Sequence, residues 1–180
     1  MKKLIIAFSF LMIMACNSKD KRPLIGETEY QQELNASYKD ASKSPLKTKD
    51  LKNFKGLDFF KIDSTFIVTA KLTKIANAPT FEMATTTDRK PLYKEYGILN
   101  FILNEKDFEL TIYQSQDDLS DKKYKDYLFL PFTDNTSGED SYGGGRYMDV
   151  MISDEKLDGT IKLNFNNTYN PYCAYNEKYS

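Results

Sequence analysis

Residues 132–147 contain the side chains best suited to chemistry. The candidates among them are three carboxylates, four of the hydroxyl groups and one guanidinium: Asp134, Glu139 and Asp140; Thr136, Ser137, Ser141 and Tyr142; and Arg146. A pair of carboxylates can do acid–base work, and the planar fork of an arginine suits a carboxylate or a phosphate. Gly143, Gly144 and Gly145 allow the backbone to pass close to a ligand. The residue types therefore suggest a site for a small polar ligand or a peptide, with Asp134, Thr136, Tyr142, Gly145 and Arg146 as binding candidates.

The same residue types also make an ordinary long connection between two strands. Asp, Ser and Gly are the usual residues of turns, because their short side chains bond to nearby backbone groups or tolerate unusual dihedrals. In this interpretation Asp134 stabilises the turn. We predict in addition that Arg146 forms a buried or half-buried ion pair with Asp134, Glu139 or Asp140.

Several kinds of chemistry are excluded by what the sequence lacks. None of the 180 residues is His, which excludes His-based triads and His metal ligands. Asp134-x-Thr136-x-Gly138 lacks the remaining ligands of a calcium loop, and no Lys-Ser/Thr follows the three glycines as a P-loop requires. With 25 basic and 26 acidic residues there is no basic excess for nucleic acid. We expect no metal, no cofactor and no nucleic-acid partner.

A second polar stretch covers residues 164–175. It contains four Asn, three Tyr and Cys173, so it can form many hydrogen bonds but offers no acid–base pair. Asn166 and Tyr169 are the binding candidates here.

The elements that must position these stretches begin with a helix, predicted over residues 26–42. Thr28 with Gln31 three residues later fits a capping box. Tyr30, Leu34 and Tyr38 form a narrow apolar stripe.

The rest of the chain has the patterns of short strands. Apolar residues alternate or cluster over residues 66–72, 81–83, 97–103, 108–112, 127–132, 147–152 and 160–165. The nearly continuous apolar run at 97–103 predicts a strand covered on both faces, and Asp158-Gly159 predicts a tight turn between the last two strands. We therefore predict a mainly β fold, an antiparallel β-barrel or sandwich of about seven or more short strands with an N-terminal helix.

The N-terminus has the features of a bacterial lipoprotein. Residues 1–15 combine a positive start with a short apolar core, as a signal peptide does. Ile13-Met14-Ala15-Cys16 fits a lipobox, so Cys16 is expected to carry the lipid and residues 16–24 to be a polar tether. The expected partner is then the membrane, and residues 25–180 form a single domain in the cell envelope. Asn17, rather than Asp, favours the outer over the inner membrane, with the leaflet left open.

The two polar stretches resemble the domain-of-unknown-function family 1684, found in exported and other bacterial and archaeal proteins. The resemblance is most specific in Phe132-x-Asp134-x-Thr136-x-Gly138, Gly145-Arg146-Tyr147, Tyr169-Asn170-Pro171 and Cys173-Ala174-Tyr175. Asn164 stands where the family usually has Asp. The resemblance implies candidate residues and a fold neighbourhood, but no reaction.

The resemblance also implies a continuation past Ser180. The family pattern goes on with a second Cys and a final strand. We expect from it that the C-terminal end is missing here and that Cys173 has a disulfide partner beyond Ser180.

Three functions stay open from sequence alone. The first is a lipid-anchored binding module for a small polar ligand or peptide. The second is a hydrolase-type enzyme using Asp134, Tyr142 and Arg146. The third is a structural scaffold that contacts other envelope proteins through its aromatic surface.

The lipoprotein prediction is tested by labelling. The full precursor, expressed in a bacterial host with labelled palmitate, should incorporate the label and partition into detergent, because two acyl chains anchor stably. Cys16→Ala should abolish incorporation. Labelling that persists in this variant would refute the prediction.

Overall fold

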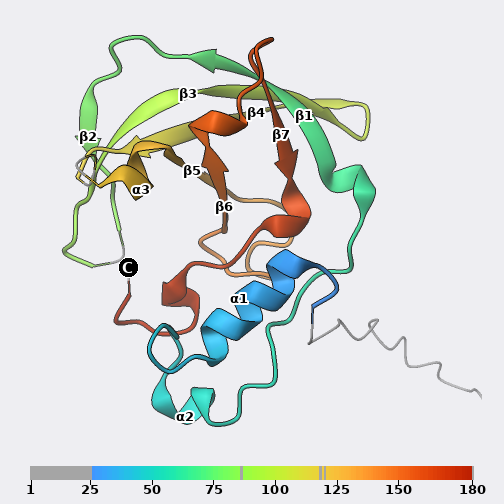
Figure 1. The fold of residues 1–180 in the computed structure, drawn as a ribbon, viewed down its shortest axis with the longest axis vertical. Helices are drawn as coiled ribbons and strands as arrows, with labels where there is room; N and C mark the ends of the chain where they lie inside the picture. Colours follow the sequence, from blue (N-terminus) through green and yellow to red (C-terminus); the bar gives the residue numbers. More distant parts are fainter. Residues whose placement is uncertain (1–25, 86, 118, 120, 180) are drawn as a thin grey trace, which may run out of the picture.

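One antiparallel sheet, curled into half of a barrel, forms the framework of the protein (Figure 1). The computed structural model describes residues 26–85, 87–117, 119 and 121–179. In this part of the chain the strands are β1 (Ile67–Lys74), β2 (Thr80–Glu82), β3 (Leu92–Leu103), β4 (Lys106–Ser115), β5 (Tyr127–Phe132), β6 (Arg146–Met151) and β7 (Thr160–Asn164). Their order is β6-β5-β4-β3-β1-β7, with β2 paired to β3. The prediction of a mainly β fold is confirmed.

The β3–β4 hairpin forms the centre of the sheet. Its register pairs Phe101 with Phe108 and Leu103 with Lys106, and Asn104 and Glu105 make the turn with φ of 50° and 62°. The expectation that both faces of residues 97–103 are covered is wrong. Leu99 and Phe101 face the core, whereas Ile102 is 64% exposed. Side chains alternate across a strand, so this sheet has one solvated face despite its apolar run.

The last two strands do not form a hairpin. Gly159 turns the chain with φ of 72°, and its N–H donates to the Lys156 carbonyl at 2.8 Å, as expected of Asp158-Gly159. However, β6 and β7 lie at opposite ends of the strand order. The chain crosses between the two edges of the curled sheet.

The core fills the inside of this curl. Every long strand contributes alternate residues, namely Val68, Ala70 and Leu72; Leu99 and Phe101; Ile112; Leu128 and Leu130; Met148 and Val150; Ile161 and Leu163. Phe101 and Phe165 lie in contact at the lower end of this core, with ring centroids 5.5 Å apart.

Helix α1 (Glu29–Lys39) lies below the half-barrel (Figure 1). Thr28 caps it by accepting a hydrogen bond from the Gln31 N–H at 3.2 Å, while the Gln31 side chain accepts from the Glu27 N–H. The helix is shorter than predicted because the Asp40 side chain bonds to Ser42, which competes with helix continuation. Tyr38 anchors α1 against Tyr175, with ring centroids 5.2 Å apart.

Short helical turns complete the fold. They are α2 (Thr48–Leu51), α3 (Lys122–Lys125), η1 (Ser64–Phe66), η2 (Ile152–Asp154), η3 (Phe165–Asn167) and η4 (Tyr172–Ala174). Across the described ranges, no helix has the length and apolar character needed to cross a membrane. The predicted signal peptide, Cys16 and the whole tether lie outside the described residues.

Gly97 of β3 lies close against β1, with no space for a side chain. It lies beside the register shift in β3, and a Cβ there would be 2.7 Å from both Leu72 Cδ1 and the Thr73 carbonyl oxygen. Gly97→Ala should therefore destabilise the protein by about 2 kcal/mol, as overpacking does. The measurement is chemical denaturation. Asn100→Ala, on the exposed face of the same strand, is the control and should change stability by less than about 0.5 kcal/mol. Equal stability of both variants would contradict this reading of Gly97.

Candidate functional site

Arg146, the first residue of β6, is placed by the glycine turn before it. Gly145 has φ of 92°, and a Cβ at this residue would be 2.4 Å from the Phe132 carbonyl oxygen. The turn is closed by the Gly145 N–H, which donates to the Tyr142 carbonyl at 2.9 Å. Only glycine combines this dihedral with so close an approach to the end of β5. Gly145 thus positions Arg146 through its backbone conformation.

The Arg146 side chain contacts four residues from three different segments of the chain. Nη2 lies 2.6 Å from Asp134 Oδ2, and Nη1 donates to Thr168 Oγ1 at 2.9 Å. The guanidinium carbon lies 5.0 Å from the centre of the Phe60 ring and 5.3 Å from that of Phe132. With 13% of its side chain exposed, Arg146 is largely buried. The predicted ion pair is confirmed, with Asp134 as the partner.

Asp134 is held by the turn that follows it. Its Oδ1 accepts from the Thr136 N–H at 2.9 Å and from the Thr136 hydroxyl at 2.6 Å. Burial alone would raise the pKa of this carboxyl. The hydrogen bonds from Thr136 and Arg146, with the positive charge of Arg146, outweigh burial and hold the pKa below its usual value. Asp134 is therefore an ionised carboxylate held by Thr136 and Arg146, as the interpretation of this segment as a structural connection expects.

Asn166 joins the polar end of β7 to the segment before β1. Its side chain accepts from the Asp63 N–H at 2.9 Å and donates to the Asp63 carbonyl at 2.9 Å. It also donates to Asn164 Oδ1 at 2.9 Å. Such two-way bonding fixes residues 60–66 against η3.

These contacts surround a pocket of about 950 Å³, within the range of small-molecule sites. One wall is apolar and comprises Phe60, Phe66, Phe101, Leu103, Phe108, Leu110, Phe132 and Phe165. The polar lining includes Gln31, Asp58, Asp63, Asp134, Thr136, Asp140, Ser141, Arg146, Asn166, Thr168 and Asn170. The pocket opens at the end of the barrel core, because Phe101 and Phe165 belong to both.

The sequence-predicted candidates fall into two groups. Asp134, Thr136, Arg146 and Asn166 line the pocket. Three others do not line it: Gly145, Tyr142 and Tyr169. The Tyr142 backbone N–H donates to Asn170 at 3.1 Å, and its phenol bonds to Cys173, which is a free thiol.

Tyr169 belongs to a different polar cluster. Its hydroxyl donates to Asp149 Oδ1 at 2.5 Å, and the Tyr127 hydroxyl donates to the same oxygen at 2.9 Å. Burial, and then the charge of Asp149, raise the pKa of Tyr127. The Tyr169 pKa is raised too, first by burial and then by its Tyr127 and Asp149 neighbours. Both tyrosines are thus neutral donors that hold a carboxylate.

The apolar wall is what sequence reasoning missed. Phe101, Phe108 and Phe165 follow the alternation of core residues, and nothing in that alternation separates a pocket wall from a filled core. The segment containing Phe60 and Asp63 gave no chemical signal of its own. The one clue in the sequence is that this segment, which lies between the predicted helix and the first predicted strand, shows neither a helical nor a strand pattern.

Asp134, one of the carboxylates of the pocket, is already held by Arg146 and Thr136. The other carboxylates of the lining are Asp58, Asp63 and Asp140, whereas Glu139 does not line the pocket. Among the described residues, no group of three or more His, Cys, Asp or Glu side chains could hold a metal ion.

Fold and site together define an antiparallel half-barrel domain with a pocket at its open end, lined by an apolar wall on one side and polar groups on the other. The chain belongs to DUF1684, a family of proteins of unknown function, whose family model matches residues 52–180. It is also similar to an uncharacterised protein of Haloarcula marismortui with a solution NMR structure. The two share 31% identity and a TM-score of 0.65, over 83% of this chain and 79% of that one. Comparison with curated proteins gives no match.

Removal of the Arg146 side chain tests its structural role. Arg146→Ala should cost about 3 kcal/mol, near the low end for a broken buried pair, because Asp134 is partly solvated and can rehydrate. Arg146→Lys should lie between this variant and the parent, since it keeps the charge but not the fork. Thermal and chemical unfolding provide the measurement, and Lys162→Ala, exposed on β7, is the control. If Arg146→Ala melts like the parent, the ion pair is not structural.

Proposed function

We propose that this protein is a binding module that holds a small ligand with an apolar body in the half-barrel pocket. The observation that supports this best is the pocket itself, with about 950 Å³ of space between an aromatic wall and a polar rim. Binding sites for small molecules commonly combine such apolar walls with a few fixed polar groups. The sequence alone suggested a polar ligand. The aromatic wall extends the proposal to a ligand that is apolar over most of its length.

The rim is rigid before any ligand arrives. Arg146 joins the 133–145 loop, β6 and the segment after β7, while Asn166 fixes the segment containing Asp63. A preformed site loses less conformational entropy on binding than a flexible one. This rigidity supports a binding role more than a scaffold role.

The proposed place of action is the cell envelope. It rests on the signal-like residues 1–15 and on Cys16 in its lipobox context. In this proposal the lipid holds the domain at the outer membrane, and the pocket meets ligands there.

Phe108 provides a direct test, because it lines the pocket and is 43% exposed, so it can be removed without opening the core. The neutral dye N-phenyl-1-naphthylamine should bind saturably, with a rise in fluorescence. An aromatic contact contributes roughly 1 kcal/mol to binding. Phe108→Ala should therefore raise the dissociation constant of the dye by roughly fivefold.

Phe81→Ala is the matched control. Phe81 is 37% exposed and lies edge-to-face with Tyr113, outside the pocket. It should bind the dye like the parent. Dye binding that fails to saturate, or that changes equally in both variants, would overturn the proposed function.

A further inference from the structure

Exposed apolar side chains gather at the end of the sheet where the pocket opens. Phe66, Ile67, Ile102 and Phe108 are between 36% and 64% exposed, and these four residues form the mouth patch. Phe66 and Phe108 also line the pocket, so the mouth patch borders its opening. Single exposed apolar side chains are ordinary on a protein surface, but a gathered set beside a pocket is typical of a contact with an apolar partner.

The pairing of the strands brings the mouth patch together. Phe66 and Ile67 lie at the start of β1, whereas Ile102 and Phe108 lie on either side of the β3–β4 turn. Because β1 is antiparallel to β3, the start of β1 lies at the same end of the sheet as that turn. Figure 1 shows this turn and η1, which contains Phe66, on the same side of the molecule, at the right of the view.

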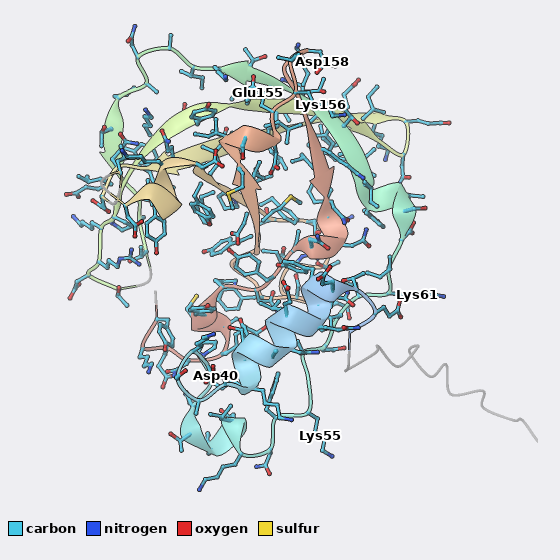
Figure 2. All side chains as sticks on the ribbon, in the orientation of Figure 1. Asp40, Lys55, Lys61, Glu155, Lys156 and Asp158 are labelled. Atoms are coloured by element: carbon cyan, nitrogen blue, oxygen red, sulfur yellow. The ribbon has the colours of Figure 1, made fainter. Side chains whose placement is uncertain are left out.

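Charged side chains of both signs surround the mouth patch. Glu105, Lys106 and Asp107 are exposed at the end of the β3–β4 hairpin. Lys61, in the pocket lining, extends outward beside α1 (Figure 2). Apolar side chains among hydrated charges suit the boundary between the head groups and the acyl chains of a bilayer, where the apolar groups are buried and the charged groups stay in water.

The expected lipid is attached a short distance along the chain from the pocket. Nine residues, 17–25, separate Cys16 from Gly26. A fully extended chain covers about 3.5 Å per residue, so Cys16 can lie at most about 35 Å from Gly26. Gly26 lies against Gln31, a pocket-lining residue, because a Cβ on Gly26 would be 2.8 Å from the Gln31 Cβ. The tether therefore joins the domain beside the pocket.

The length and position of the tether decide which apolar surface the mouth patch meets. A lipid at Cys16 holds the pocket end of the domain close to the bilayer at all times, whereas a protein partner has to arrive by diffusion. Contact between two tethered surfaces is intramolecular, so the high effective concentration compensates for the small size of the patch.

We propose that the mouth patch lies on the bilayer that holds the lipid, so that the pocket opens toward the acyl chains and receives its ligand from them. The inference rests on the proposed function, both for the pocket and for the anchor at Cys16. In this position the four side chains of the mouth patch are removed from water, which is favourable for apolar surface. The apolar wall of the pocket then continues into the acyl layer.

The test uses tryptophan fluorescence, because the sequence contains no Trp and a single introduced one reports on its own surroundings. Ile102→Trp places the reporter in the mouth patch. Leu92→Trp is the matched control, since Leu92 is also exposed but begins β3, ten residues or about 33 Å along the same strand. The lipidated full chain of each variant is reconstituted into phosphatidylcholine vesicles, with and without lipid brominated high on one acyl chain.

Bromine quenches tryptophan only on contact, so the anchor alone produces no signal. Emission from Ile102→Trp should fall by about half in the brominated vesicles and shift to shorter wavelength, as expected of a side chain at the boundary of the acyl layer. Emission from Leu92→Trp should stay unchanged.

Two further changes in the Ile102→Trp protein assign the contact to the mouth patch. Ile67→Glu puts a carboxylate into the patch and should remove most of the quenching, because a charged group resists transfer out of water. Thr73→Glu adds the same charge on the same exposed face, near the other end of β1, and should leave the quenching unchanged. Both positions are exposed, so neither change should alter the melting temperature appreciably.

The outcomes separate this inference from the proposed function. Quenching that is confined to Ile102→Trp and lost on Ile67→Glu supports the inference. If neither reporter is quenched, or both are quenched equally, the inference is refuted, while saturable dye binding to the pocket leaves the binding function standing. Absence of quenching together with a dimer that Ile67→Glu dissociates assigns the mouth patch to a second copy of the chain and also overturns the inference. If palmitate labelling shows no lipid at Cys16, the proposed place of action is wrong and the inference fails with it.

Discussion

The contact between Arg146 and Asp134 is the interaction on which the pocket rests. Burying a guanidinium near phenyl rings is unfavourable unless its charge is neutralised and its N–H groups are hydrogen-bonded. Asp134 neutralises the charge, Thr168 accepts a hydrogen bond from Nη1, and the rings of Phe60 and Phe132 lie beside the planar group. These partners belong to three segments far apart in sequence, around Phe60, around 132–134 and at Thr168. The need to satisfy one cation therefore brings the rim of the pocket together.

The curled sheet explains why the protein has a pocket at this end. β6 and β7 are the two edges of the sheet, and the curl stops before they meet along their length. Beside β6, the segment after β7 is joined to the sheet by a reciprocal pair of backbone hydrogen bonds between Tyr147 and Tyr169, at 2.9 and 3.0 Å. The inner face is filled with aliphatic side chains along the strands. At its lower end it ends in phenyl rings that no other layer covers completely, and the space between them and residues 58–63 is the pocket.

The fold was largely predictable because the sheet has one buried face. Alternation such as Val68, Ala70 and Leu72 identifies strands by local pattern alone, and the capping residue Thr28 located the start of α1. Strand order was not predictable, since the pattern of β6 and β7 is the same whether they pair or lie apart. The burial of residues 97–103 was misjudged for a related reason. Ile102 is apolar yet exposed, and hydrophobicity does not say which way a side chain points.

The site was predictable only in its polar half. Arg146 and Asp134 could be paired by chemistry, because a lone guanidinium in an acidic loop needs a partner. Phe60 and Phe108 could not be assigned to a pocket wall, since aromatic residues in a β protein usually fill the core. A side chain in a pocket wall faces open space, whereas a side chain in the core faces another packed side chain. That difference depends on three-dimensional packing and leaves no mark in the local sequence.

The second polar stretch, predicted as part of one site, contributes to two different clusters: the pocket lining and the tyrosine cluster around Asp149. In extended backbone, successive side chains point to opposite sides. Thr168 and Asn170 line the pocket, while the side chain of Tyr169 between them reaches Asp149 on β6. The tyrosine fixes the segment to the edge of the sheet, and its neighbours present an amide and a hydroxyl to the pocket. A change at Tyr169 would therefore move pocket residues without touching the pocket, which makes Tyr169 a positioning residue for the rim that Arg146 holds from the other side.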